Sequence, residues 1–217
     1  DLHVHAPQYR NLGIAMDMEL LPWLNTYTFP EEMKYSDVKY AERMYRRFVH
    51  DLWKLGTMRA AIFATIHPAA SCLLADLLHE ANMGGMIGLV GMDRNSPEGL
   101  TNTVEQWREG MEQLMIHTAS MPLVSTIVTP RFIPSCTPEM LNEMGQLAHD
   151  EQLPVQSHLS ENQSEIEWVK ELEPLASCYG DAYNRYGLFG QTPTLMAHCC
   201  YTDKEEFELM RTNRVFA

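Results

Sequence analysis

Short apolar runs alternate with amphipathic stretches along most of the chain, and this order predicts strands that alternate with helices. Helical spacing, with apolar residues three and four positions apart, first appears between Ser36 and Gly56. Runs that are apolar almost throughout are typical of a parallel sheet that is buried on both faces. We expect strands at residues 58–65, 85–91, 123–129, 154–158 and 194–198, and helices at residues 69–81, 101–117, 138–151, 164–172, around 181–186, and 203–212.

The first five residues, Asp1 to His5, alternate between polar and apolar and are typical of the end of a further strand. This alternation places His3 and His5 on one face of the strand, roughly 6–7 Å apart. Two imidazoles at this separation can bind one metal ion, and neutral imidazole is a good ligand for zinc. A chance His-x-His, or a pair of surface histidines, is the competing interpretation.

Two further histidines favour the metal interpretation. His158 and His198 each end a strand-like run, so four histidines lie at three strand ends that helical stretches separate. A doubly wound open sheet and a closed (β/α)8 barrel both fit alternating strands and helices. The histidines favour the barrel, because all strands of a barrel deliver their C-terminal residues to one mouth.

The predicted fold is therefore α/β, a (β/α)8 TIM-type barrel. Six strands precede a seventh that begins at Val215, so residues 1–217 are expected to form one partial barrel domain that lacks the last strands. No repeat, low-complexity run or charged linker marks a second domain. Residues 6–32 are rich in aromatic side chains and are expected to form a long irregular loop, a kind of segment that is often functional.

Composition narrows the classes of function. The 217 residues are 45% hydrophobic, enough for one sizeable core, and carry 16 Lys and Arg against 29 Asp and Glu, a net charge of −13. This acidic balance argues against nucleic acid or an anionic membrane as a partner. Five scattered cysteines without Cys-x-x-Cys spacing indicate reduced thiols and a cytoplasmic location. We interpret Cys199 and Cys200, beside His198, as packing residues.

Glu161 follows His158 by three residues and lies in the loop after the predicted strand. A metal ion lowers the pKa of a bound water, but a further group must still carry the proton onwards. A carboxylate beside the metal suits that role. The alternative is a Glu that only caps the next helix.

Arg131 and Phe132 follow the predicted strand at residues 123–129. The fork of donors on Arg131 and the flat face of Phe132 suit a planar heterocycle, as when arginine binds the O6 and N7 of guanine. Gln8, three residues after His5, adds an amide donor and an acceptor. A surface ion pair is the alternative for Arg131. Residues 121–132 contain no Lys that could bridge two metals, which favours one metal ion.

Seven stretches of the sequence carry a resemblance to a known family. They are Asp1–Tyr9, Trp23–Pro30, Phe63–His67, Met92–Pro97, Ile127–Phe132, Gln156–Asn162 and Met196–His198. Together they resemble the guanine deaminase family of the amidohydrolase superfamily, in its mononuclear zinc branch, and the likeness runs almost end to end. The family fold is the (β/α)8 barrel flanked by a small β-sandwich.

The resemblance implies zinc-dependent hydrolysis of guanine to xanthine and ammonia, with one zinc per subunit and a zinc-activated water that attacks the ring carbon bearing the amine. It implies a cytoplasmic homodimer whose partner is a small-molecule substrate. By matching position, His3, His5, His158 and His198 are metal ligands, Glu161 and His198 are catalytic, and Gln8, Arg131, Phe132 and His158 bind the substrate. The family's eighth-strand Asp and its β-sandwich have no counterpart here, so we expect a segment of a longer enzyme.

Two other interpretations stay open at the level of sequence. The chain could be a degenerate metal-binding barrel that serves as a scaffold, although a structural metal site has no use for a loose carboxylate such as Glu161. It could also act on another aminated or chlorinated heterocycle, such as a triazine, a pterin or an adenosine derivative. Gln8 with Arg131 and Phe132 favours guanine over these.

Overall fold

The computed structural model describes all 217 residues. They form two compact units, which are described separately. The first unit comprises Asp1–Val90, Pro97–Leu100 and Glu105–Ile127, and the second comprises Gly91–Ser96, Thr101–Val104 and Val128–Ala217. The expectation of one barrel domain over residues 1–217 stays a prediction.

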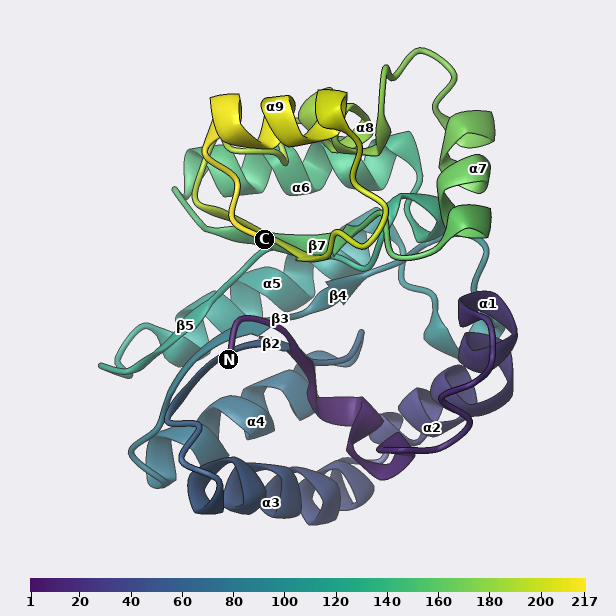
Figure 1. Cartoon of the computed structure of the whole chain (residues 1–217). Coiled ribbons are helices and arrows are strands. Elements are labelled where there is room, and N and C mark those ends of the chain that lie inside the picture. The colour runs from purple at the N-terminus through teal and green to yellow at the C-terminus, as the bar shows by residue number, and fades with distance from the viewer. The chain divides into compact units, whose positions relative to one another are not determined.

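The first unit is built on a four-stranded parallel sheet in the order β1-β2-β3-β5. Residue pairing runs from His5 opposite Phe63 to Ile87 opposite Thr126. Figure 1 shows α3 and α4 lying together along this sheet. The elements are β1 (Val4–His5), β2 (Arg59–Phe63), β3 (Gly84–Gly88), β5 (Val124–Thr126), α3 (Val38–Lys54), α4 (Pro68–Glu80) and α5 (Val104–Thr118).

The helix predicted between Ser36 and Gly56 is confirmed as α3. Its N-cap, Asp37, accepts a hydrogen bond from the backbone N–H of Lys39, which satisfies one of the free donors at a helix start. Its apolar residues recur three and four positions apart and are buried, in a helix that packs mainly on α4: Ala41, Met44, Tyr45, Phe48 and Val49. Burial of this stripe, rather than intrinsic propensity, is the main stabilisation of such a helix.

The prediction that residues 6–32 are irregular holds for residues 12–19 and is wrong for the rest. The rest form short helical turns, and Pro7 and Pro30 lie in first turns, where the missing N–H of proline is tolerated. Each turn is too short to show a helical period in sequence. The turns are η1 (Ala6–Asn11), α1 (Leu20–Trp23), the π-helical η2 (Leu24–Thr28) and α2 (Phe29–Glu32), and η3 (Met33–Ser36) follows them.

Two predicted strands are interrupted. The run at residues 85–91 divides into β3 and β4 (Val90–Gly91), and the run at residues 123–129 divides into β5 and β6 (Thr129–Pro130). The break in the first run falls at Leu89, whose carbonyl accepts a hydrogen bond from the indole N–H of Trp107 at 3.2 Å. That carbonyl is therefore satisfied by a helix side chain rather than by a neighbouring strand.

The second unit contains further parallel strands. β7 (Val155–Leu159) pairs with β8 (Thr194–His198), with His158 opposite Ala197 and Leu159 opposite His198. Val128 bridges to Val155, and Phe216 bridges in parallel to Leu195, where the sequence predicts the start of another strand. The helices of the second unit are η5 (Ile133–Ser135), α6 (Pro138–Asp150), α7 (Gln163–Leu172), α8 (Tyr179–Asn184) and α9 (Lys204–Asn213). The short η4 (Glu98–Leu100) belongs to the first unit.

Helix α6 begins as predicted, because the Thr137 side chain accepts a hydrogen bond from the backbone N–H of Met140. Its Gly145 packs directly on the segment that follows α8. A Cβ atom at this position would lie 1.8 Å from the carbonyl oxygen of Tyr186, closer than any side chain can approach. Gly145 is therefore required by packing, and not by its backbone conformation.

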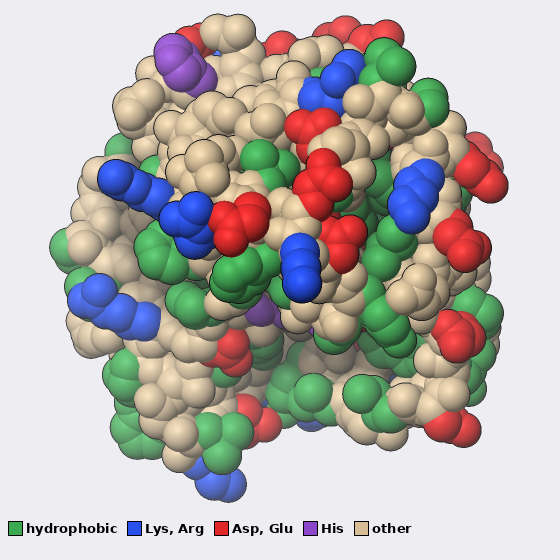
Figure 2. Space-filling model, turned by 45° about the horizontal axis from the view of Figure 1, so that its top comes forward, with side chains coloured by type: hydrophobic (Ala, Val, Ile, Leu, Met, Phe, Trp, Pro, Cys, Tyr) green, Lys and Arg blue, Asp and Glu red, His purple; other side chains and the backbone are tan.

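The fold class is α/β with parallel sheets, as the alternation of apolar and amphipathic stretches predicts. None of the helices combines the length and the apolar character that a membrane crossing needs. Figure 2 shows acidic, basic and hydrophobic side chains intermixed on the face toward the viewer, without a continuous basic field.

Candidate metal and catalytic centre

The first unit presents two histidines at the end of β1. The ring centroids of His3 and His5 are 4.9 Å apart and the rings are nearly perpendicular, as expected for side chains on one face of a strand. His5 stacks on Phe63, with centroids 4.4 Å apart. The pairing continues back to the chain start, because the backbone N–H of Ala61 donates to the carbonyl of Asp1 at 3.0 Å. Phe63 and the sheet therefore fix the orientation of both imidazoles.

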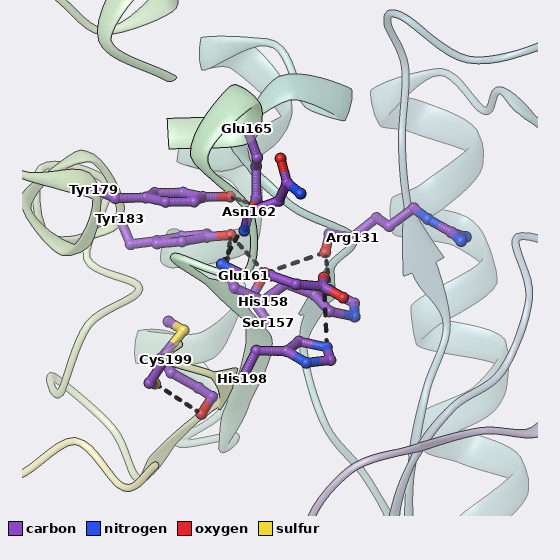
Figure 3. A network of polar contacts seen from close by, with 11 residues as sticks. Arg131, Ser157, His158, Glu161, Asn162, Glu165, Tyr179, Tyr183, His198 and Cys199 are labelled. Carbon is purple, nitrogen blue, oxygen red and sulfur yellow. Dashed lines mark hydrogen bonds and ion pairs between the residues drawn. The ribbon is translucent and has the colours of Figure 1, made fainter. Parts of the chain in front are cut away.

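The second unit brings together three groups that the sequence places at two strand ends. His158 lies on β7, His198 ends β8, and Glu161 follows β7 in the loop (Figure 3). The two imidazole rings stack with centroids 5.4 Å apart. His198 Nε2 and Glu161 Oε2 are 3.5 Å apart. One ligand atom from each of the three residues lies within 4.8 Å of the other two, a spacing that a single metal ion can bridge.

The hydrogen bonding of His158 fits a metal ligand. Its Nδ1 lies 2.6 Å from the carbonyl oxygen of Arg131, so Nδ1 carries the proton and donates it. This leaves the lone pair on Nε2. Metal-binding histidines are usually fixed in this way, with the second nitrogen bound to a carbonyl or carboxylate. The donor set of imidazole nitrogens and one carboxylate suits a divalent cation such as zinc.

The backbone on both sides of this centre is strained. Ser160 has a φ of 48° and His198 a φ of 73°, in the left-handed region that residues other than glycine rarely adopt. Such residues cluster at functional sites and persist only when their surroundings hold them. Here the N–H of Cys199 donates to the carbonyl of Leu159, and the N–H of Tyr201 donates to that of Ser160, both at 2.9 Å. These bonds join the loops that carry Glu161 and His198.

The protonation of Glu161 and His198 suits chemistry near neutral pH. Burial raises the pKa of Glu161 to about 7, the charge of Glu165 adds to this shift, and Arg131 opposes it. Burial lowers the pKa of His198, so its imidazole is neutral at pH 7. A carboxyl group with a pKa near 7 can both accept and donate a proton under these conditions.

Apart from His158, the candidate substrate residues take different positions. Arg131 is almost completely buried, its carbonyl faces His158, and its guanidinium extends away from that histidine (Figure 3). Phe132 is also buried and meets the ring of Trp168 edge-on, with centroids 6.4 Å apart. Gln8 is half-buried in η1 of the first unit. Cys199 is partly buried, and its thiol donates to the carbonyl of Met196 at 3.5 Å, whereas Cys200 is exposed, so the packing role predicted for Cys200 is wrong.

Several residues that surround the centre were missed from the sequence. Two phenols of α8 stack with centroids 5.5 Å apart: Tyr179 donates to Glu165 at 2.7 Å, and Tyr183 donates to the carbonyl of His158 at 2.9 Å (Figure 3). The spacing Asn162-x-x-Glu165 is a capping-box signal that could have identified Glu165. No sequence pattern connects α8 with β7, so the tyrosines could not be found in this way.

Comparison with known proteins identifies the class. Residues 1–215 match the model of the Amidohydrolase family, and the chain therefore belongs to the amidohydrolase family. It is 43% identical to guanine deaminase of Dictyostelium discoideum over 216 residues, 99% of this chain and 48% of that protein. It is 39% identical to guanine deaminase of Homo sapiens over 214 residues, 96% of this chain and 46% of that protein. The chain thus spans about half the length of these curated relatives.

A solved structure gives the same relationship. The crystal structure of guanine deaminase from C. acetobutylicum, with guanine bound in its active site, superimposes with a TM-score of 0.97 at 48% identity. The match covers 99% of this chain and 52% of that one.

Proposed function

We propose that the protein catalyses the hydrolytic deamination of guanine to xanthine and ammonia. The observation that carries this proposal is the cluster of His158, Glu161 and His198, in which a carboxyl with a pKa of about 7 lies 3.5 Å from a histidine. The similarity to guanine deaminases of Dictyostelium discoideum, Homo sapiens and Escherichia coli supports guanine as the substrate.

We propose that His3 and His5 bind one zinc ion per subunit together with His158 and His198. Each histidine lies at or next to the C-terminal end of a parallel strand, and the proton on Nδ1 leaves Nε2 of His158 available as a ligand. The assignment follows from the predicted (β/α)8 barrel, in which all strands deliver their C-terminal residues to one mouth. A bound zinc ion supplies a nucleophilic water near neutral pH, because it lowers the pKa of that water.

Proton transfer explains why Glu161 is needed. The ring carbon that bears the amine of guanine is a poor electrophile while the ring is neutral, and an unprotonated amine is a very poor leaving group. In our proposal Glu161 accepts one proton of the attacking water and delivers it to the adjacent ring nitrogen, and the second proton of that water passes to the amine, which leaves as ammonia. Its raised pKa suits both halves of this transfer. His198, neutral at pH 7, binds the metal or orients the water.

Substrate recognition is proposed for Arg131, Phe132 and Gln8. The guanidinium fork of Arg131 suits the acceptor atoms on one edge of guanine, Phe132 offers a face for the ring, and the amide of Gln8 can donate and accept. We propose the same role for His158. The cytoplasmic location and the homodimer implied by family resemblance stay predictions.

The test is product formation by the purified intact protein. We expect ammonia and xanthine from guanine, and little or no ammonia from an aminotriazine, a pterin or adenosine at the same concentration. Preferred turnover of one of those compounds would assign the site to another heterocycle. No turnover of any of them by protein that retains its metal would favour the scaffold interpretation.

A further inference from the structure

The loop that carries Glu161 is bound by a buried carboxylate at its C-terminal side. Glu165, in the first turn of α7, is completely buried, and its Oε2 accepts the backbone N–H groups of Glu161 at 3.1 Å and Asn162 at 3.2 Å. Its other oxygen accepts the hydroxyl of Tyr179 at 2.7 Å. An ordinary helix cap is exposed to water, whereas both oxygens of this one are occupied inside the protein (Figure 3).

A second buried carboxylate binds the same loop one residue earlier. Glu206 of α9 is 2% exposed, and its Oε2 accepts the hydroxyl of Ser160 at 2.7 Å. Its Oε1 accepts the backbone N–H of Gly180 at 2.8 Å. Ser160 is the residue in the left-handed conformation, so this bond holds a strained turn between His158 and Glu161.

Three consecutive residues, Ser160, Glu161 and Asn162, are therefore each bound by one of two carboxylates from different helices. An apolar side chain in place of either carboxylate would leave these donors buried without their acceptor. Neither carboxylate belongs to the three-residue metal cluster. Their common effect is on the position of the Glu161 side chain relative to His198.

We propose that Glu165 and Glu206 are positioning residues for Glu161, and that they hold its carboxylate where it can exchange a proton with the reacting groups. The proposal rests on the proposed function, because it is the proton transfer by Glu161 that makes its position matter. A displacement of about 1 Å at such a group can lower a rate by about a hundredfold.

The test compares alanine and glutamine variants of both residues in the intact protein. The Gln side chain keeps one oxygen that can accept from the backbone N–H groups, and its NH2 group can donate to the hydroxyl of Tyr179 or Ser160. The Ala side chain removes both hydrogen-bonding groups. Glu173→Ala is the matched control, because Glu173 is a buried carboxylate of the same unit that accepts the hydroxyl of Tyr186 at 2.7 Å and does not contact the loop. Ser160→Ala removes only the hydroxyl that Glu206 accepts, and keeps the test decisive if a carboxylate variant does not fold.

The first measurement does not depend on activity. In metal-free protein we expect amide hydrogen exchange at residues 160–162 to become about tenfold faster or more in Glu165→Ala, Glu206→Ala and Ser160→Ala, and to stay unchanged in the Gln variants and in Glu173→Ala. Unchanged exchange in the Ala variants would overturn the proposal.

The second measurement is steady-state kinetics with guanine. We expect the Ala variants to lower kcat by about ten- to hundredfold at nearly constant KM and zinc content, and the Gln variants to stay within about threefold of wild type. In protein that already carries Glu161→Gln, adding Glu165→Ala should not lower kcat further. The Gln side chain introduced by the first substitution cannot carry the proton, so the rate no longer depends on where that side chain lies. A multiplicative loss in this double variant would overturn the proposal. A wild-type protein without guanine activity would instead contradict the proposed function, and the exchange measurement would then decide on the two carboxylates by itself.

Discussion

Replacing Glu161 with Gln removes the proton-carrying group of the centre and leaves its size and hydrogen-bonding capacity nearly unchanged. In the structure the Glu161 carboxylate is close enough to His158 and His198 to be either a metal ligand or a proton shuttle. Our account assigns it to the shuttle. The substitution distinguishes the two roles, because a lost ligand lowers metal content and a lost shuttle lowers only the rate.

The magnitude follows from the environment of Glu161. General acid–base catalysis contributes about 10²–10⁴-fold, most when the pKa of the group is near the working pH. Burial and Glu165 place the pKa of Glu161 at about 7, and a bound cation would lower it, because opposite charge favours the carboxylate. We therefore expect a loss near the middle of the range, about 10³-fold in kcat, or about 4 kcal/mol in the activation barrier.

The assay is ammonia release from guanine under steady-state conditions, with zinc content determined by mass spectrometry on the same samples. Glu167→Gln is the control, because Glu167 lies exposed on α7 and undergoes the same change of charge. We expect Glu161→Gln to keep its KM and its zinc. Loss of zinc would make Glu161 a ligand, and wild-type kcat would refute the shuttle.

Further predictions concern recognition, packing and buried charge. Arg131→Ala should raise KM for guanine by about ten- to hundredfold with a smaller change in kcat, because a charge-assisted pair contributes about 1.5–3 kcal/mol; an unchanged KM would remove Arg131 from the binding site. Gly145→Ala should destabilise the fold by about 1–3 kcal/mol or more, because its Cβ would overlap the carbonyl of Tyr186, and an unchanged Tm would contradict this packing. Burial raises the pKa of Glu206, so the folded state binds the proton more tightly than the unfolded state does. Wild-type metal-free protein should therefore lose stability relative to Glu206→Gln as the pH rises above the ordinary glutamate pKa of 4.5, and parallel Tm curves would contradict the shift.

Strands and helices could be predicted from the sequence where burial of one face gives the apolar residues a regular spacing. The strand at residues 194–198 has an apolar centre, Leu195 to Ala197, and it has the predicted bounds in the structure. The helix α3 shows its buried stripe plainly in sequence. Residues 6–32 could not be assigned in this way, because their 3-10, α and π turns are each shorter than two helical periods. Local sequence also gives no sign of the indole–carbonyl bond that coincides with the break at Leu89.

The residues of the centre could be predicted where they lie at or just after the ends of predicted strands. His158 and His198 end neighbouring parallel strands, and Glu161 follows one of them, so their proximity in the second unit follows from topology. The residues that hold this loop could not be inferred. Tyr179 and Glu206 come from helices whose distance from β7 depends on tertiary packing, and no short-range pattern encodes that distance.

The most direct test of the account is a zinc titration of the intact protein with guanine turnover as the readout. After removal of metal by a chelator we expect no ammonia release, because a nucleophilic water near neutral pH then has no source. Added zinc should restore activity linearly up to one ion per subunit and no further. Activity that survives complete metal removal, or that rises until two ions are bound, would contradict the account.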